Sequence, residues 1–187
     1  MASEAGGTPQ VLLGYSLGGR LAFHALLCRP ELWSAAVIVS AHPGYEASSV
    51  CNSRIAADEQ WARRFLTEPW DLLIRDWNAQ SIFGRMKNMF SPEENDFSRE
   101  LIALTFRVFS TGRQESLVSK LAELSAPPVL YLSGEFDTAY TALGSGLAKK
   151  IPVLSPAVIA NTWHRAPWED PEQFVSLVQD FLGKVLI

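Results

Sequence analysis

Ser16 stands at the centre of a G-x-S-x-G pattern, G-Y-S-L-G over residues 14–18, in which the serine hydroxyl can serve as a nucleophile. The apolar run over residues 9–14 predicts a buried strand, and helical spacing follows over residues 18–28. A serine on such a strand-to-helix turn is strained, and a glycine two residues to either side leaves room for the turn. The helix start also points the Leu17 N–H at the site as a donor for an oxyanion. We therefore predict a nucleophile elbow, the alternative being an ordinary tight turn.

A serine nucleophile needs a base that accepts its proton and an acid that orients the base. Where this elbow occurs, the chain order is serine, acid, histidine. Asp137 follows the apolar run 128–133 and is the predicted acid, with Glu135 as the competing candidate; either carboxylate could instead cap the next helix. His164 is the only histidine after Asp137, so chain order predicts it as the base.

The chain has two other histidines. His24 falls inside the helix that follows the elbow, and we expect it to pack against its surroundings. His42 comes directly after the second predicted strand, where its side chain could face the same site. Neither follows the acid in chain order, so neither is predicted as the base.

These residues need a scaffold of alternating strands and helices. The predicted elements, in order, are a strand at 9–14, a helix at 18–28, a strand at 35–41, several helices between 42 and 125, a strand at 128–133, a helix at 138–150, a short strand near 157–160 and a helix at 171–185. Such alternation is typical of a parallel sheet with helices on its faces. We predict one α/β domain over residues 1–187, with a helical lid inserted at about 43–125.

Composition excludes several classes of protein. The net charge of −4 argues against a nucleic-acid partner or an anionic membrane surface, each of which needs a basic patch. No apolar run reaches the roughly 18 residues of a membrane-spanning helix. Cys28 and Cys51 show neither metal-ligand spacing nor a disulfide framework. Residues 1–10 do not read as a secretory signal. We expect a cytoplasmic protein.

Further residues resemble one family with this elbow. The resemblance spans about residues 9–185 and is carried by GYSLGGR at 14–20, HPG at 42–44, Arg54, Asp58, Trp61, RFLTEP at 64–69, DW at 76–77, residues 111–117, Gly134, Glu135, Asp137, His164, Glu169 and Pro171. These residues look like those of the 2-succinyl-6-hydroxy-2,4-cyclohexadiene-1-carboxylate synthases of menaquinone biosynthesis, which have the α/β-hydrolase fold.

The resemblance implies Ser16, Asp137 and His164 as the catalytic triad of a lyase that needs no cofactor. It implies elimination of pyruvate from 2-succinyl-5-enolpyruvyl-6-hydroxy-3-cyclohexene-1-carboxylate, with the activated serine taking a proton instead of forming an acyl-enzyme. A small polycarboxylate would then be the ligand. Oligomeric state is left open.

The resemblance also places Tyr15, Arg20, Arg54 and Trp77 around that anionic substrate, together with the elbow residue after the serine. Arginine side chains suit this role because their planar fork binds carboxylates through two hydrogen bonds. Arg20 comes one helical turn after the elbow serine, on the same helix face. Arg107 is a weaker candidate, and Arg99 is weaker still; each arginine could instead be a solvated surface charge.

Three departures from the family pattern bear on function. Trp163 stands where family members usually have glycine, and the segment from Ser91 to Arg107 looks shortened, which puts one substrate arginine in doubt. A complete fold has about four strands before the elbow and a histidine-glycine turn that supplies a second oxyanion donor. Here the N-terminal half of the sheet is missing, so the strand at 11–13 would have a bare edge that invites association.

Three explanations for the missing half compete: a fragment or late start, a part supplied by another chain, or a truncated inactive form. We expect residues 1–187 alone to be inactive and poorly soluble. Two other functions stay open. One is an α/β-hydrolase acting on an ester or carbon–carbon bond, because fold and triad alone do not set the reaction. The other is a non-catalytic homologue.

Overall fold

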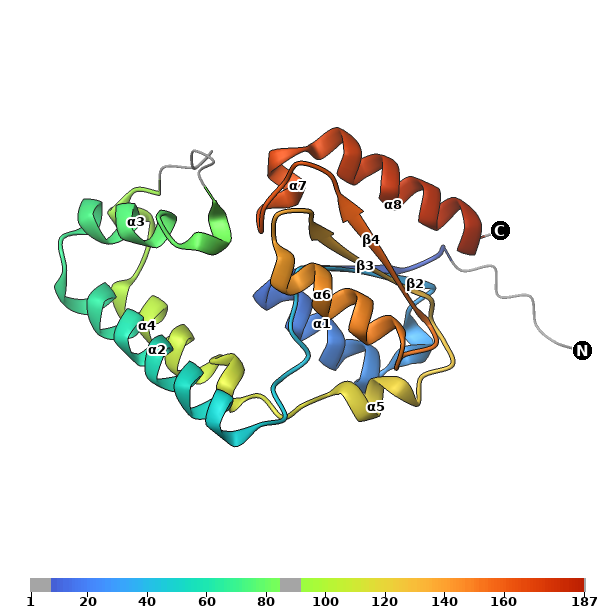
Figure 1. Ribbon diagram of the computed structural model, residues 1–187, viewed down its shortest axis with the longest axis horizontal. Coiled ribbons are helices and arrows are strands. Elements are labelled where there is room, and N and C mark those ends of the chain that lie inside the picture. The colour runs from blue at the N-terminus through green and yellow to red at the C-terminus, as the bar shows by residue number, and fades with distance from the viewer. Residues whose placement is uncertain (1–7, 85–91, 187) are drawn as a thin grey trace, which may run out of the picture.

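A parallel sheet of four strands forms the centre of the molecule in the computed structural model, which describes residues 8–84 and 92–186 (Figure 1). The strands lie in the order β1-β2-β3-β4. Their bounds are β1 Val11–Tyr15, β2 Ala35–Val39, β3 Val129–Gly134 and β4 Leu154–Ile159. Every neighbouring pair is parallel, which confirms the predicted α/β class. Most of residues 1–10, which were not expected to be a secretory signal, and residue 91, where the shortened segment starts, lie outside the described residues.

The last strand begins earlier than the sequence analysis predicted. Its first half contains Ser155 and Pro156, residue types that are depleted in strands. Proline is tolerated there because β4 is the outer strand of the sheet and pairs only with β3 among the described strands. A prediction from residue propensities therefore included only the C-terminal, apolar half of β4.

Helices cover both faces of the sheet (Figure 1). One face carries α1 (Leu17–Cys28), α5 (Val118–Ala122) and α6 (Thr138–Ala148), and apolar side chains from all three join those of β2 and β3 in one core cluster. The other face is covered by α8 (Pro171–Val185), preceded by the short α7 (Ala166–Glu169). The predicted helix at 171–185 coincides with α8.

The outer edge of β1 has no strand partner among the described residues. Leu13, in the middle of β1, is 53% exposed although its neighbours in β2 are fully buried. An unpaired apolar strand edge is a surface that favours association, so the expectation of self-association stays a prediction with a structural basis.

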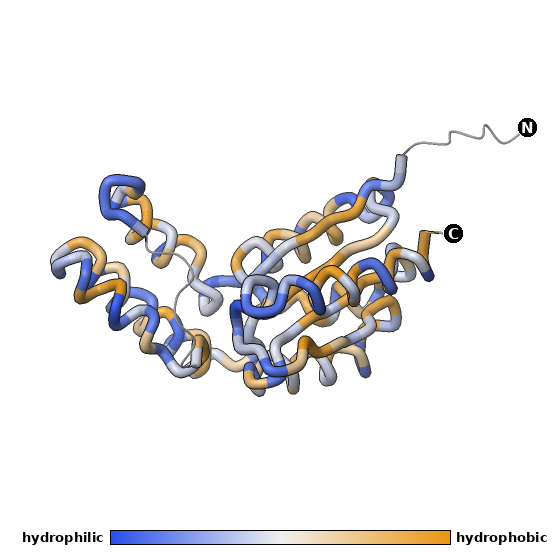
Figure 2. Tube along the Cα trace, turned by 90° about the horizontal axis from the view of Figure 1, so that it is seen from above, coloured by the Kyte–Doolittle hydropathy of each residue, from blue (hydrophilic) through white to orange (hydrophobic). Residues whose placement is uncertain are grey.

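The helices inserted between β2 and β3 form a lobe beside the sheet layer (Figures 1 and 2). It consists of α2 (Ser48–Thr67), α3 (Trp70–Asn78) and α4 (Arg99–Val108), and no strand occurs in the described parts of residues 42–125. Phe65, Trp70 and Leu73 form its small apolar core. Single turns of 3-10 helix complete the described chain at Pro30–Leu32, Ser81–Phe83, Glu94–Asp96 and Thr111–Arg113. Within the described parts of the chain, every helix is too short or too polar to cross a membrane.

Candidate functional site

The turn between β1 and α1 holds Ser16 in a backbone conformation that few non-glycine residues adopt. Its φ is +48°, and its N–H donates to the Val39 carbonyl at 2.8 Å. A Cβ on Gly14 would lie 2.5 Å from the Gly18 carbonyl oxygen, and one on Gly19 would lie 2.6 Å from Cβ of Ala41. Position 18 has open space around an added Cβ. The steric need for glycine after the serine therefore falls on Gly19, and the sequence-based argument for Gly18 was wrong.

Three side chains far apart in the sequence meet at this turn. His164 Nδ1 lies 2.7 Å from Oδ2 of Asp137, and His164 Nε2 lies 3.3 Å from Oγ of Ser16. Both Asp137 and His164 are buried. With the Nδ1–H donating to the carboxylate, Nε2 is left to accept the serine proton. This is the arrangement of a catalytic triad, in which an aspartate orients a histidine base beside a serine nucleophile.

The structure separates the two acid candidates. Asp137 precedes α6 without a capping hydrogen bond from its side chain, so its carboxylate is committed to the histidine. Glu135 is exposed, and its Oε2 accepts instead from the Asn161 N–H at 2.8 Å. Only Asp137 of the two contacts His164.

Aromatic rings surround the histidine. The ring centroids of Tyr140, Tyr15 and Phe83 lie 4.9, 5.5 and 6.0 Å from that of His164. Burial raises the pKa of the Tyr15 hydroxyl well above its usual range. Tyr15 lies beside the base and against Trp168, outside the lining of the pocket described next. Its position suits a packing role beside the triad.

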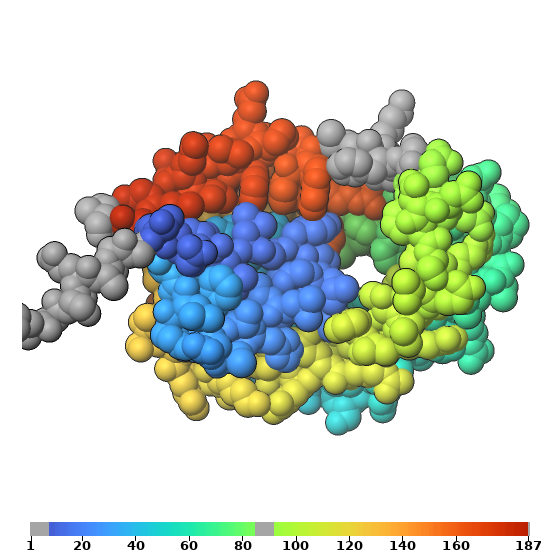
Figure 3. Space-filling model, turned by 180° about the vertical axis from the view of Figure 1, so that it is seen from behind, coloured from blue at the N-terminus to red at the C-terminus, as the bar shows by residue number. Residues whose placement is uncertain are grey.

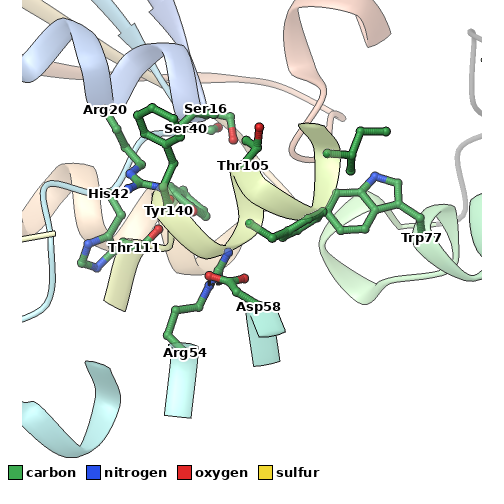
Figure 4. Close-up of a pocket in the computed structure, with 14 residues that line it drawn as sticks. Ser16, Arg20, Ser40, His42, Arg54, Asp58, Trp77, Thr105, Thr111 and Tyr140 are labelled. Atoms are coloured by element: carbon green, nitrogen blue, oxygen red, sulfur yellow. Dashed lines mark hydrogen bonds and ion pairs between the residues drawn. The ribbon is translucent and has the colours of Figure 1, made fainter. Parts of the chain in front are cut away.

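A pocket of about 310 Å³ opens in front of Ser16, between the sheet layer and the helical lobe (Figure 4). Seen from behind, the molecule is hollowed between α1 and α4 (Figure 3). The lining residues come from both parts: Ser16, Leu17, Arg20, Ser40, His42, Arg54, Asp58, Trp77, Ile102, Thr105, Phe106, Phe109, Thr111 and Tyr140. The exposed surface of its wall is mainly apolar, although nine of these fourteen residues have polar side chains.

Two guanidinium groups give the pocket its charge. Arg20 Nε donates to Oε1 of Gln114 and Nη1 donates to the Phe109 carbonyl, both at 2.7 Å, which fixes the side chain beside Ser16. Burial and the neighbouring Arg54 lower the pKa of Arg20. Two cations near each other are stabilised by an anionic ligand, which removes their mutual repulsion.

Arg54 is held by a carboxylate on its own helix. Its Nε donates to Asp58 Oδ1 and Oδ2 at 3.0 and 2.9 Å, and Asp58 is buried at 3% exposure. Burial disfavours the charged guanidinium, but the hydrogen bond and charge of Asp58 outweigh it and raise the pKa of Arg54. The pair therefore fixes a guanidinium at the pocket wall, beside a carboxylate that also lines the pocket and offsets its charge.

His42 lines the same pocket as these arginines, near enough for their charges to act on it. Burial, followed by the charges of Arg20 and Arg54, lowers its pKa to about 4, so the imidazole is neutral at neutral pH. Its Nδ1 accepts the Gly44 N–H at 3.1 Å, which leaves the hydrogen on Nε2 as a donor.

Comparison with known proteins agrees with this geometry. The family model described as "Alpha/beta hydrolase family" matches residues 2–177. This chain belongs to the alpha/beta hydrolase family. It is 30% identical to 2-succinyl-6-hydroxy-2,4-cyclohexadiene-1-carboxylate synthase of Pectobacterium atrosepticum over 179 residues, covering 92% of this chain and 68% of that protein. It is 31% identical to the synthase of Escherichia coli O1:K1 over 183 residues, covering 91% of this chain and 67% of that protein.

A solved structure gives the same picture of the fold. The structure of MenH from S. aureus matches 96% of this chain and 70% of its own length, with a TM-score of 0.85 at 24% identity. This likeness shows the α/β-hydrolase fold. The chain spans about two thirds of the length of these relatives, so its four-stranded sheet is partial relative to them.

Several residues of this alpha/beta hydrolase lie where the sequence analysis did not place them. Arg107 lies outside the pocket lining and donates to Glu59 from Nε and Nη2, at 2.8 and 3.1 Å. Arg99 is also outside, bonded to Glu94 and to two backbone carbonyls of the lobe. His24 is exposed on α1, so the expectation that it packs was wrong. The helix turns it to the side opposite the buried residues of α1.

Sequence reasoning missed other pocket residues of this family member. Ser40 and Tyr140 carry polar groups and received no role, although each follows the end of a strand by at most six residues. That position was a usable signal, because ligands of open α/β sheets bind at the carboxyl ends of the strands. Thr105, Phe106 and Thr111 come from the lobe, where no such rule applies.

Proposed function

We propose that this chain performs the elimination catalysed by the 2-succinyl-6-hydroxy-2,4-cyclohexadiene-1-carboxylate synthases, releasing pyruvate in menaquinone biosynthesis in the cytoplasm. The observation that carries the proposal is the meeting of a serine–histidine–aspartate arrangement with two arginines, Arg20 and Arg54, at one pocket. A plain esterase site needs the first feature but has no use for paired cations. The similarity to relatives of that name supports the same reaction.

The proposed chemistry uses Ser16 as a base. His164 Nε2 accepts the hydroxyl proton while Asp137 steadies the imidazolium that forms. The serine oxygen takes the ring proton next to the succinyl ketone of the substrate. The electron pair of that C–H bond forms a new ring double bond, the existing double bond shifts by one position, and the C–O bond to the enolpyruvyl group breaks. The oxygen of the leaving enolpyruvate takes the proton held by His164 Nε2, which restores the neutral base, and the enol then becomes pyruvate by tautomerisation.

The backbone around Ser16 assists this step in the proposal. Charge develops on the ketone oxygen as the proton leaves, and the Leu17 N–H at the start of α1 is placed to donate to it. The second donor of a complete family member is not assigned to a residue of this chain. Loss of one such donor typically slows turnover by about a hundredfold to a thousandfold. The sequence analysis expected residues 1–187 alone to be inactive; because the triad contacts and the Leu17 N–H are present, we propose slow turnover instead.

Substrate recognition in the proposal falls to the arginines. Arg20 uses Nε and Nη1 inside the protein, which leaves Nη2 for a ligand carboxylate. Arg54 offers a second guanidinium, paired with Asp58, while the neutral His42 of the same lining carries a hydrogen-bond donor without adding charge. Trp77 supplies an apolar wall for the ring of the substrate.

Release of pyruvate by the wild-type chain tests the proposal. The chain is mixed with the cyclohexene substrate at comparable concentrations, because turnover is expected to be slow, and pyruvate is measured with lactate dehydrogenase and NADH. A neutral ester, 4-nitrophenyl acetate, is assayed in parallel. Pyruvate release without ester hydrolysis supports the lyase. Rapid hydrolysis of the ester with no pyruvate would favour the hydrolase alternative, and no reaction with either would favour a non-catalytic homologue.

A further inference from the structure

Ser40 occupies the residue position after β2 that matches the elbow serine after β1. Tyr15 and Val39 are register partners at the ends of the two strands, so Ser16 and Ser40 are adjacent at the carboxyl edge of the sheet. Both have positive φ values, +48° and +45°. The Ser40 N–H donates to the Leu132 carbonyl at 2.8 Å, which accounts for its backbone donor.

The side chain of Ser40 is buried without a partner. Its exposure is 0%, and its Oγ has no hydrogen-bond partner among the residues that the structure describes. A buried hydroxyl without a partner costs free energy, because it has lost its hydrogen bonds to water. The same residue lines the pocket in front of Ser16 (Figure 4).

Ser40 therefore carries two costs in free energy, a strained backbone conformation and a buried hydroxyl without a hydrogen bond. Glycine would relieve the positive φ, and alanine would remove the unpaired hydroxyl. Strained residues are found most often at ligand sites, where the surrounding structure holds them in place. An unpaired hydroxyl on a residue that lines a pocket is explained if a bound ligand reaches it and completes its hydrogen bonds.

The charges around the pocket indicate the ligand atom. Arg20, Arg54 and His42 all carry N–H groups and line the pocket, the lining carboxylate of Asp58 offsets the charge of Arg54, and His42 is only two residues from Ser40. The positive charge that this lining does not offset is that of Arg20, whose hydrogen-bond partners among the described residues are neutral, and it suits an anionic oxygen. We propose that Ser40 is a specificity-determining residue whose Oγ donates a hydrogen bond to a carboxylate oxygen of the substrate beside Ser16. This inference deepens the proposed function and rests on it.

Ligand binding and stability together test the role of Ser40. The probe is 2-succinylbenzoate, an aromatic keto-dicarboxylate that carries the succinyl chain and ring carboxylate of the proposed substrate. Its affinity for the whole chain is measured by isothermal titration calorimetry. Ser40→Ala and Ser40→Gly should each weaken binding about tenfold or more, the range for a lost hydrogen bond to a charged group. Thermal unfolding without the probe should show neither variant less stable than the wild type.

Ser133→Ala is the matched control. Ser133 is equally buried, but its Oγ is paired with the Thr141 hydroxyl at 3.0 Å and it lies outside the pocket. This variant should lose stability and keep its affinity for the probe. Loss of affinity without loss of stability at Ser40, and loss of stability without loss of affinity at Ser133, would distinguish a hydroxyl that binds the ligand from one that stabilises the fold.

An Arg20→Ala arm separates failure of this inference from failure of the proposed function. If Arg20→Ala weakens binding and Ser40→Ala binds within twofold of the wild type, the role of Ser40 is overturned and the carboxylate pocket stands. If Ser40→Ala weakens binding and Arg20→Ala does not, the ligand oxygen is not a carboxylate oxygen and the assignment is wrong. A wild-type chain that does not bind the probe would overturn both.

Discussion

The sheet layer and the helical lobe are built from different interactions. Strands β2 and β3 are buried at every position, and the core on the α1 face joins large apolar side chains from several elements. The lobe has a small aromatic core around Phe65. Its surface carries ion pairs such as Arg64–Glu68 and Arg64–Asp76. Buried apolar packing is rigid, whereas exposed ion pairs each add little stability.

This difference matches the division of roles that we propose. The residues that need fixed geometry, Ser16, Asp137 and His164, all follow strands of the sheet layer. Arg54 and Trp77, which would contact the substrate at a distance from the reacting atoms, come from the lobe. Arg20 belongs to the sheet layer but is held by groups in the segment that returns from the lobe. Substitutions in the sheet layer should therefore change turnover, and substitutions in the lobe should change affinity.

The largest effect is expected at the elbow. Ser16→Ala should lower pyruvate release by at least about a thousandfold, since removal of a triad serine eliminates the group that accepts the proton. Binding of 2-succinylbenzoate should change little, because the substituted hydroxyl is one of many pocket contacts. Turnover is followed by pyruvate formation, and unfolding in urea checks that the variant folds. Activity within tenfold of the wild type would rule out Ser16 as the reacting residue.

The next largest effect is expected on ligand affinity, when either pocket arginine is replaced. Arg20→Ala and Arg54→Ala should each weaken binding of the dicarboxylate probe by about tenfold to a hundredfold, the usual loss for a charge-assisted hydrogen bond. Arg63→Ala is the control, because Arg63 is on the same helix as Arg54 but pairs with Glu59 outside the pocket. Equal binding by all three variants would mean that the pocket does not recognise carboxylates.

Much of the sheet layer was predictable because its signals are local. A fully apolar run such as Ala35–Val39 and an amphipathic helix that starts with Pro171 each determine an element without help from the rest of the chain. The start of β4 was missed, since Ser155 and Pro156 hide an edge strand that is held by pairing with β3. The exposure of His24 was also missed, although its position in the helix puts it opposite the buried Ala22 and Leu26.

The site was predictable where chain order constrains it and less so in the lobe. The order of serine, acid and histidine singled out three residues, which the structure brings within hydrogen-bonding distance. The arginines of the lobe carry no such rule. Arg54 and Arg107 are both arginines within predicted helices, and the sequence does not distinguish them. Only three-dimensional packing places Arg54 in the pocket and pairs Arg107 with Glu59.

A smaller effect concerns the pH dependence of stability. The pKa of His42 is about 4 in the folded chain, below the value of about 6.5 for an unperturbed histidine. The unfolded state therefore binds more protons between these values, so stability contributed by this group falls as the pH drops from about 6.5 to about 4. His42→Asn keeps an acceptor for the Gly44 N–H and removes the titration.

Urea unfolding of the wild type and His42→Asn at about pH 7.5 and about pH 5 measures this difference. The wild type should lose more stability than the variant on acidification, because the other titrating groups are common to both. Equal losses would show that His42 has an ordinary pKa in the folded chain and that the two arginines do not act on it.

The smallest effect separates the two kinds of arginine in the lobe. Arg107 resembled a substrate ligand in the sequence, but its side chain is 40% exposed and paired with Glu59 across α2 and α4. Exposed pairs contribute little, and this one is outside the pocket lining, so Arg107→Ala should keep probe affinity and pyruvate release within about twofold of the wild type. Arg54→Ala, measured in the same titration, supplies the contrast. A tenfold loss of affinity in Arg107→Ala alone would mean that Arg107 leaves Glu59 to meet the ligand, and that the lobe rearranges when substrate binds.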